Sequence, residues 1–197
     1  MDTPASASDP MVAKLASGSY GDLWNYAVRD SVVDAIWAEP DSLRRLEAIA
    51  SDGGAPLAAR FVACEVLYER EFTFLGVVGR ERVAGIYVAA FQQNLTGMAN
   101  SWGLLYEGDD YGPAGARLVG LGAAAIPALL PLLHDDHPGP IYAGSEEATV
   151  GNARGYRVKD YAAFYLSKIA KIPVPWHDAP AERDAEIARL EQALQAR

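Results

Sequence analysis

The apolar residues of this 197-residue chain recur every three or four positions in most of its segments, and this spacing limits the folds it can adopt. Such a period places the apolar residues on one face of an α-helix, whereas a half-buried strand needs strict alternation. Clear stripes run through 41–51, 56–67, 83–91 and 156–170. Glycine and proline separate these segments. The sequence therefore predicts a mainly all-α fold.

The expected helices lie at 11–15, 22–37, 41–51, 56–67, 83–91, 114–118, 122–133, 156–170 and 178–194. Pro127 and Pro131 fall inside one of them, and an interior proline removes a backbone hydrogen bond, so this helix is predicted to start near Ala125 or to bend. Residues 72–79 are interpreted as an apolar connector, with a short strand as the alternative. Residues 98–113 are predicted to form a loop, and the two prolines of 172–176 predict extended chain.

The segment 135–155, called the insertion below, is polar and glycine-containing where two helices would otherwise be joined tightly. It includes the short β-prone pieces 141–143 and 148–150, so a small β-hairpin near 140–152 is an open interpretation. An ordered insertion of this length often carries function. This segment is therefore the first place to look for a binding surface.

Two stretches resemble HEAT-like, armadillo-type helical repeats. Residues 121–133 are rich in Leu and Pro like the first helix of such a repeat, and 157–169 open on Arg157-Val158 and continue with Ala162-Ala163 like the second. A more degenerate pair spans 43–67, and together they cover about half of the chain. The resemblance implies an irregular α-α superhelix of stacked antiparallel helix pairs that binds another protein. With it we predict a flexible lead at 1–10 and a single domain at 11–197.

The chain has 26 acidic and 17 basic residues, a net charge of −9, which disfavours nucleic acid and favours a basic protein partner. No window has the roughly 18–20 uncharged apolar residues that a transmembrane span needs. The single cysteine, Cys64, lies among apolar residues and is expected to be buried. Because the first ten residues lack a basic start and an apolar run, a cytoplasmic location is expected, with export after signal removal as the alternative.

His134, Asp135, Asp136 and His137 place four metal-ligand side chains in a row. Adjacent ligands converge on one ion only if the backbone turns sharply, and the usual ligand spacings are missing. A metal-assisted hydrolase that uses this cluster is therefore an alternative to the protein-binding interpretation. No nucleophile motif occurs, so we predict no catalytic residue, no cofactor and a protein that is not an enzyme.

Polar and aromatic residues gather in the insertion and at the start of the following helix, and they are the predicted partner-binding residues. They are Tyr142, Glu146, Glu147, Asn152, Arg154, Tyr156, Arg157, Lys159 and Asp160. Alternatively, Glu146 or Glu147 pairs with Arg157 to pin the insertion, and Asp160 complements a helix N-terminus. The functional prediction is an immunity-type or regulatory protein whose partner, possibly basic, meets this region. A structural subunit of an assembly is the third hypothesis.

Overall fold

The computed structural model describes residues 9–18, 29–144 and 146–196. Contacts divide the chain into two compact units, Met1–Gly97 and Met98–Arg197, which are described separately. The described residues are mainly helical, and the part of the chain that they cover contains no β-strand beyond one isolated bridge. The all-α prediction is confirmed. That 11–197 folds as one domain stays a prediction.

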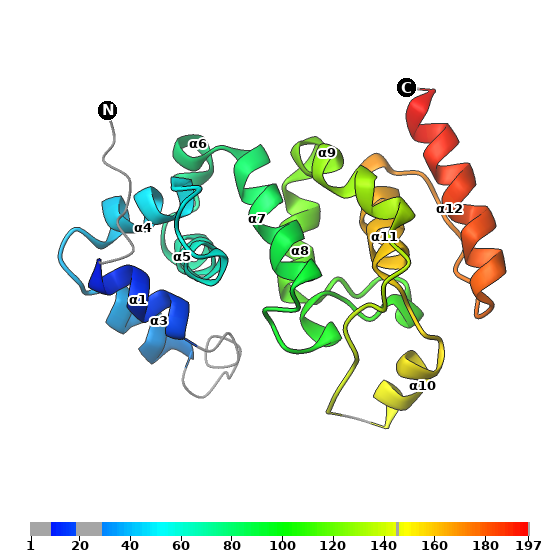
Figure 1. The fold of residues 1–197 in the computed structure, drawn as a ribbon, viewed down its shortest axis with the longest axis horizontal. Helices are drawn as coiled ribbons and strands as arrows, with labels where there is room; N and C mark the ends of the chain where they lie inside the picture. Colours follow the sequence, from blue (N-terminus) through cyan, green and yellow to red (C-terminus); the bar gives the residue numbers. More distant parts are fainter. Residues whose placement is uncertain (1–8, 19–28, 145, 197) are drawn as a thin grey trace. The chain divides into compact units, whose positions relative to one another are not determined.

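The helices of the first unit, with the labels of Figure 1, are α1 (Pro10–Ser17), α3 (Arg29–Trp37), α4 (Ser42–Ser51), α5 (Leu57–Arg70), α6 (Phe74–Val78) and α7 (Arg80–Gln92). The carboxylate of Asp9 caps α1 by accepting the amide of Met11 at 2.8 Å, so Asp9 and Pro10, which the sequence analysis assigned to the lead, belong to this helix and its cap. The predicted helix at 22–37 is described from Arg29 onward. The first part of that prediction, 22–28, lies outside the described residues.

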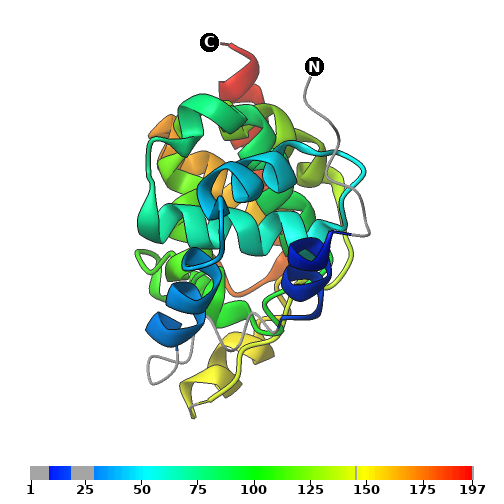
Figure 2. The same ribbon diagram turned by 90° about the vertical axis from the view of Figure 1, so that its left-hand side faces the viewer.

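Helix α5 forms the centre of the first unit and contacts α1, α3, α4 and α7 (Figures 1 and 2). It is buried on nearly every side, and Cys64 is buried within it, as expected. The carboxylate of the buried Glu65 accepts a hydrogen bond from the Tyr87 hydroxyl of α7. A buried polar group without such a partner would be destabilising, so this bond accounts for a glutamate in the core.

The connector expected at 72–79 contains the five-residue helix α6. Phe74, Leu75 and Val78 are buried, which explains the apolar run without a strand. Gly79 then adopts φ +92°, a value that side-chain-bearing residues rarely take, and this turn separates α6 from α7.

The second unit begins with two short 3₁₀ helices, Ala99–Ser101 and Leu105–Glu107, in the predicted loop. Its other elements are α8 (Gly112–Gly120), η3 (Gly122–Ala125), α9 (Ile126–Leu129), η4 (Leu130–His134), α10 (Glu147–Ala153), α11 (Val158–Ala170) and α12 (Pro180–Gln195). Helix α11 is its core and contacts α8, α9, η4 and α12. Tyr161 to Leu166 are all buried.

The two prolines break the helix predicted at 122–133 into η3, α9 and η4. Pro127 lies in the first turn of α9 and Pro131 in the first turn of η4, where a missing backbone N–H costs little. The α-helical part begins at Ile126, which agrees with the predicted start near Ala125.

The β-hairpin interpretation of 140–152 is wrong, because residues 141–143 form no strand and Glu147–Ala153 form helix α10. Ala148 and Gly151 turn inward from one side of this short helix. Their spacing of three is helical, and a β-prone composition is overridden when packing favours a helix.

The chain between α11 and α12 is non-helical, as predicted, and Trp176 packs on Phe164 with ring centroids 5.7 Å apart. Within the described residues, no single helix has the length and apolar character to cross a membrane. The segments Gly112–Gly120 and Gly122–His134 meet these criteria only together, with a bend of 108° between them.

Candidate functional site

The insertion is closed at its base by backbone pairing between its two ends. The amide of Gly139 donates to the carbonyl of Tyr156 at 2.9 Å, and the amide of Val158 donates to the carbonyl of His137 at 2.9 Å. Pro138 and Arg157 form an isolated antiparallel bridge at the same place. The insertion is therefore a closed loop on the N-terminal end of α11.

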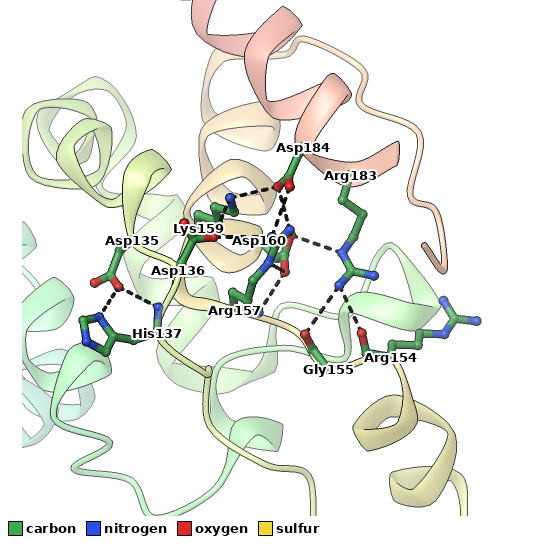
Figure 3. A network of polar contacts seen from close by, with 10 residues as sticks. All are labelled: Asp135, Asp136, His137, Arg154, Gly155, Arg157, Lys159, Asp160, Arg183 and Asp184. Carbon is green, nitrogen blue, oxygen red and sulfur yellow. Dashed lines mark hydrogen bonds and ion pairs between the residues drawn. The ribbon is translucent and has the colours of Figure 1, made fainter. Parts of the chain in front are cut away.

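A cluster of ion pairs, called the polar clasp below, surrounds this base (Figure 3). Its members are Asp136, Arg157, Lys159, Asp160, Arg183 and Asp184. At its centre Asp160 is fully buried. Its carboxylate accepts the backbone amide of Arg157 at 2.8 Å and the guanidinium of the same residue at 3.0 and 3.1 Å, which caps α11.

Arg183, in the first turn of α12, completes the buried part of the clasp. Its Nε lies 3.1 Å from the carboxylate of Asp160, and both side chains are inaccessible to solvent. Its Nη2 donates to the carbonyl of Arg154 at 3.0 Å, and Nη1 donates to the carbonyl of Asp178 at 2.7 Å. The guanidinium also stacks over the Tyr156 ring at 5.1 Å. One side chain therefore ties α12 to the end of the insertion.

The outer part of the clasp is partly exposed. Asp184 pairs with Arg157 at 2.8 Å and with Lys159 at 2.9 Å, and Asp136 pairs with Lys159 at 2.6 Å. The hydrogen bond from Arg157 lowers the pKa of Asp184 below its ordinary value. Three carboxylates face three cations, so the clasp neutralises itself. The residues of the clasp therefore hold the base of the insertion in place.

Buried tyrosines hold the middle of the insertion. The Tyr142 hydroxyl accepts hydrogen bonds from the amide of Leu105 at 3.2 Å and from the Tyr161 hydroxyl at 2.9 Å, and it donates to the carbonyl of Gly103 at 3.2 Å. Burial raises the pKa of Tyr142 above its ordinary value. The side-chain amide of Asn152 pairs with both backbone groups of Tyr142, at 2.8 and 2.9 Å. This pairing fastens α10 to the strand-like segment beside it.

Large apolar side chains, in contrast, are exposed in the insertion and directly before Ala99, which pairs with it. Met98, Ile141 and Val150 are 39%, 68% and 52% exposed, and they are called the apolar patch below. The amide of Ala99 donates to the carbonyl of Ile141 at 2.8 Å, which places Met98 beside Ile141 in the chain pairing. Asn152 holds the segment that contains Val150 next to Tyr142. Sequence reasoning missed this patch because 141–143 and 148–150 were interpreted as strands.

The predicted partner-binding residues divide by burial. Tyr142 and Tyr156 are only 3% and 5% exposed, so the interpretation of these two as accessible anchors is corrected: they pack inside the unit. Arg157, Lys159 and Asp160 belong to the clasp, and the acids that pair with Arg157 are Asp160 and Asp184 rather than the glutamates of the insertion. Three further candidates complete the set: Glu146 is exposed, Asn152 is used by Tyr142, and Arg154 pairs with Asp178 at 3.3 Å. The Glu147 side chain lies outside the described residues.

The candidate metal ligands do not converge. His137 Nδ1 lies 2.7 Å from the carboxylate of Asp135, whereas His134 faces Glu191 at 3.2 Å and Asp136 is engaged by Lys159. Over the ranges that the structure describes, no three His, Cys, Asp or Glu side chains are arranged to hold an ion. Adjacent side chains of an extended segment point in different directions, and this explains the dispersal.

Comparisons with protein-family models, curated proteins and solved structures found no match to this chain. A function for the insertion therefore has to follow from its own geometry. That geometry is a closed loop with neutralised charges at its base, buried tyrosines in its middle and exposed apolar side chains.

Proposed function

We propose that this chain is a protein-binding module whose partner contacts the apolar patch of the insertion. The observation that carries the proposal is the concentration of exposed apolar side chains. Of the five large hydrophobic residues exposed in the described part of the chain, two lie in the insertion, Ile141 and Val150, and a third, Met98, precedes the residue whose amide bonds to the carbonyl of Ile141. Exposed apolar groups that gather in one place, with polar residues around them, are typical of protein interaction sites.

The rigidity of the insertion supports the same function. Its backbone is fixed at the base by the clasp and in the middle by Tyr142 and Asn152. A surface that is already ordered loses little conformational entropy on binding, so more of the contact energy appears as affinity. A loop without such internal contacts would lose more conformational entropy on binding, and its affinity would be lower.

Charge favours a partner with basic residues around its contact surface. Glu146 and Glu107 are exposed, and Tyr106, next to Glu107, packs edge-on against Tyr142 at 5.2 Å. The whole chain carries −9, so a basic protein would be attracted at long range. An immunity-type or regulatory protein that masks a basic partner fits this combination.

The HEAT-like resemblance supports the proposal at the level of architecture. Helices α9 and α11, from the two resembling stretches, contact each other, and the insertion joins them. We propose that this helix pair is part of an irregular α-α superhelix of armadillo type. In such superhelices, insertions commonly lie on a binding face. This likeness is an analogy of fold and specifies no partner.

The test compares capture by three immobilised proteins from a lysate of the native host: the native chain, the double variant Ile141→Glu and Val150→Glu, and the control Phe72→Glu. Phe72 is 61% exposed in the first unit, so it matches Ile141 in exposure but lies outside the patch. We expect the patch variant to lose at least tenfold of the captured partner, because two buried charges would face its apolar surface. Equal capture by the patch variant and the native chain would refute the proposal.

A further inference from the structure

The Met1–Gly97 unit has an exposed apolar surface of its own at helix α6. Phe72 and Val77 are 61% and 66% exposed, and they are the other two of the five large hydrophobic residues exposed in the described part of the chain. Helix α6 turns Phe74, Leu75 and Val78 into the unit, so its other side is left to solvent. Exposed apolar residues that lie in one short segment are typical of a surface that another molecule covers.

A hollow of about 480 Å³ lies beside Phe72. Its lining consists of Phe72, Thr73, Leu75, Gly76, Arg80 and Glu81, and together with Val77 these residues are called the α6 surface below. They come from α6, the two residues before it and the first turn of α7, and the two helices contact each other (Figure 1). The Phe72 ring also packs against the Tyr68 ring, with centroids 6.0 Å apart. The α6 surface therefore has both an exposed aromatic side chain and a hollow with room for one.

Two charged residues of opposite sign, Arg80 and Glu81, border the hollow at the first turn of α7. Both are exposed, and within the ranges that the structure describes neither side chain forms an ion pair or a hydrogen bond. The next arginine is engaged, in contrast, since Arg82 donates to the carbonyl of Ser51 at 2.8 Å. The α6 surface thus offers one unpaired cation and one unpaired anion next to its exposed apolar residues.

We propose that the α6 surface binds a second copy of this chain about a two-fold axis. In such an interface each pair of contacting residues occurs twice, with the roles of the two copies exchanged. A surface with one unpaired cation beside one unpaired anion is complementary to itself in this arrangement. Arg80 faces Glu81 of the second copy, and Glu81 faces Arg80 of the second copy. Phe72 of each copy fills the hollow of the other.

Charge separates a second copy from other kinds of protein partner. A strongly basic protein would place like charge against Arg80, and a strongly acidic one would place it against Glu81, which costs binding energy in either case. Two copies of the chain, each with a net charge of −9, repel each other at long range. The Debye length of about 8 Å at physiological salt screens most of this repulsion, but it leaves pairs in direct contact. We therefore expect a weak, reversible dimer.

Sedimentation equilibrium of the full chain at about 1 µM to 1 mM tests the proposal, because a small interface predicts weak association. We expect the native chain to form dimers in the upper part of this range. Arg80→Glu and Glu81→Arg, each alone, should weaken dimerisation about tenfold or more, since like charges then face each other across the axis. An equimolar mixture of the two variants should dimerise as strongly as the native chain, because two acidic residues of one then face two arginines of the other.

Phe72→Glu removes the aromatic contact and should abolish dimerisation. Ile141→Glu in the apolar patch is the matched control and should dimerise like the native chain, because it is exposed to a similar extent but belongs to the other unit. Helical circular dichroism should stay native in all four variants, since each changes an exposed residue. We expect Phe72→Glu to capture the partner of the apolar patch normally, so the result for one surface does not depend on the other.

A native chain that stays monomeric up to the highest concentration would overturn the proposal. So would a dimer that survives Phe72→Glu, or two charge variants whose mixture does not recover the association. If the native chain is monomeric and Phe72→Glu loses a captured protein, the α6 surface binds a different protein rather than a second copy.

Discussion

The base and the outer face of the insertion use opposite chemistry. At the base, Arg157, Asp160 and Arg183 are charged but buried or nearly so, and they satisfy each other. On the outer face, Ile141 and Val150 are apolar but exposed. Charged residues therefore hold this segment in place, whereas apolar residues are what it presents to other molecules. A cluster of charged residues in a sequence is therefore a poor guide to a binding surface when it contains both acids and bases, because these residues can form ion pairs with one another.

The strongest test of this contrast is to break the clasp with Arg183→Ala. Asp160 would lose one of its two cationic partners while it stays buried, and breaking a buried ion pair costs about 3–5 kcal/mol. We expect a loss of this size in the free energy of unfolding measured with urea. Asp109→Ala is the control, because its pair with Lys168 is 94% exposed on the aspartate side and should contribute less than about 1 kcal/mol. Equal losses in the two variants would show that the clasp is no stronger than a surface pair.

The buried tyrosines predict a loss of stability at high pH. Burial raises the pKa values of Tyr142, Tyr161 and Tyr165 above the ordinary value of 10.0. Below pH 10 both folded and unfolded chains keep these protons. Above it the unfolded chain releases them and the folded chain does not, so each tyrosine lowers stability by up to about 1.4 kcal/mol per pH unit.

Urea unfolding at pH 9, 10 and 11 measures this slope. Tyr165→Phe should make the slope shallower by up to about 1.4 kcal/mol per pH unit, because one group with a raised pKa is removed. A slope that is the same in native and variant proteins would contradict the assignment of the raised pKa to Tyr165.

Next in size is the packing of α10 on the tyrosines. A Cβ on Gly151 would lie 2.5 Å from ring atoms of both Tyr106 and Tyr142, so Gly151→Ala should cost about 1–3 kcal/mol through overpacking. Gly120→Ala is the matched control in α8, where a Cβ would meet nothing within 4 Å and stability should stay the same or rise slightly. Hydrogen exchange of the α10 amides measures the local effect. Unchanged protection in Gly151→Ala would mean that α10 is not held by these rings.

The smallest effect is expected on the outer face. Ile141→Glu should change the free energy of unfolding by no more than about 0.5 kcal/mol, because the side chain is 68% exposed and has little apolar contact to lose. Thermal denaturation measures it. A large loss would place Ile141 in the core of the insertion and remove it from the proposed interface.

The sequence predicted most of the helices because their signal is local. Leu46 and Ile49 of α4, and Val158 to Ala170 of α11, follow a 3.6-residue period that any helix must show to bury one face. The same is true of the break at Pro127 and Pro131, which depends only on the proline ring. Helix α10 was missed because it is seven residues long and its stability comes from contacts between Gly151 and distant tyrosines.

For the candidate site, the sequence located the region but not the roles of its residues. It expected Asp160 to complement a helix N-terminus, and Asp160 caps α11. It expected Arg157 to pair with Glu146 or Glu147, whereas Arg157 pairs with Asp160 and Asp184. It gave no sign of Arg183 or Asp184, which lie more than twenty positions away and reach the clasp only because α12 folds back on α11.

By itself, then, the sequence determined a mainly helical chain, the positions of its breaks and its net negative charge. Periodicity and proline act over a few neighbouring residues, and net charge follows from composition, so none of the three depends on the fold. The tertiary structure decided which polar residues are consumed internally and which apolar residues remain outside. Burial depends on contacts between segments far apart in the chain. For this reason Tyr142, expected at an interface, lies in the core, and Ile141, its neighbour, lies on the surface.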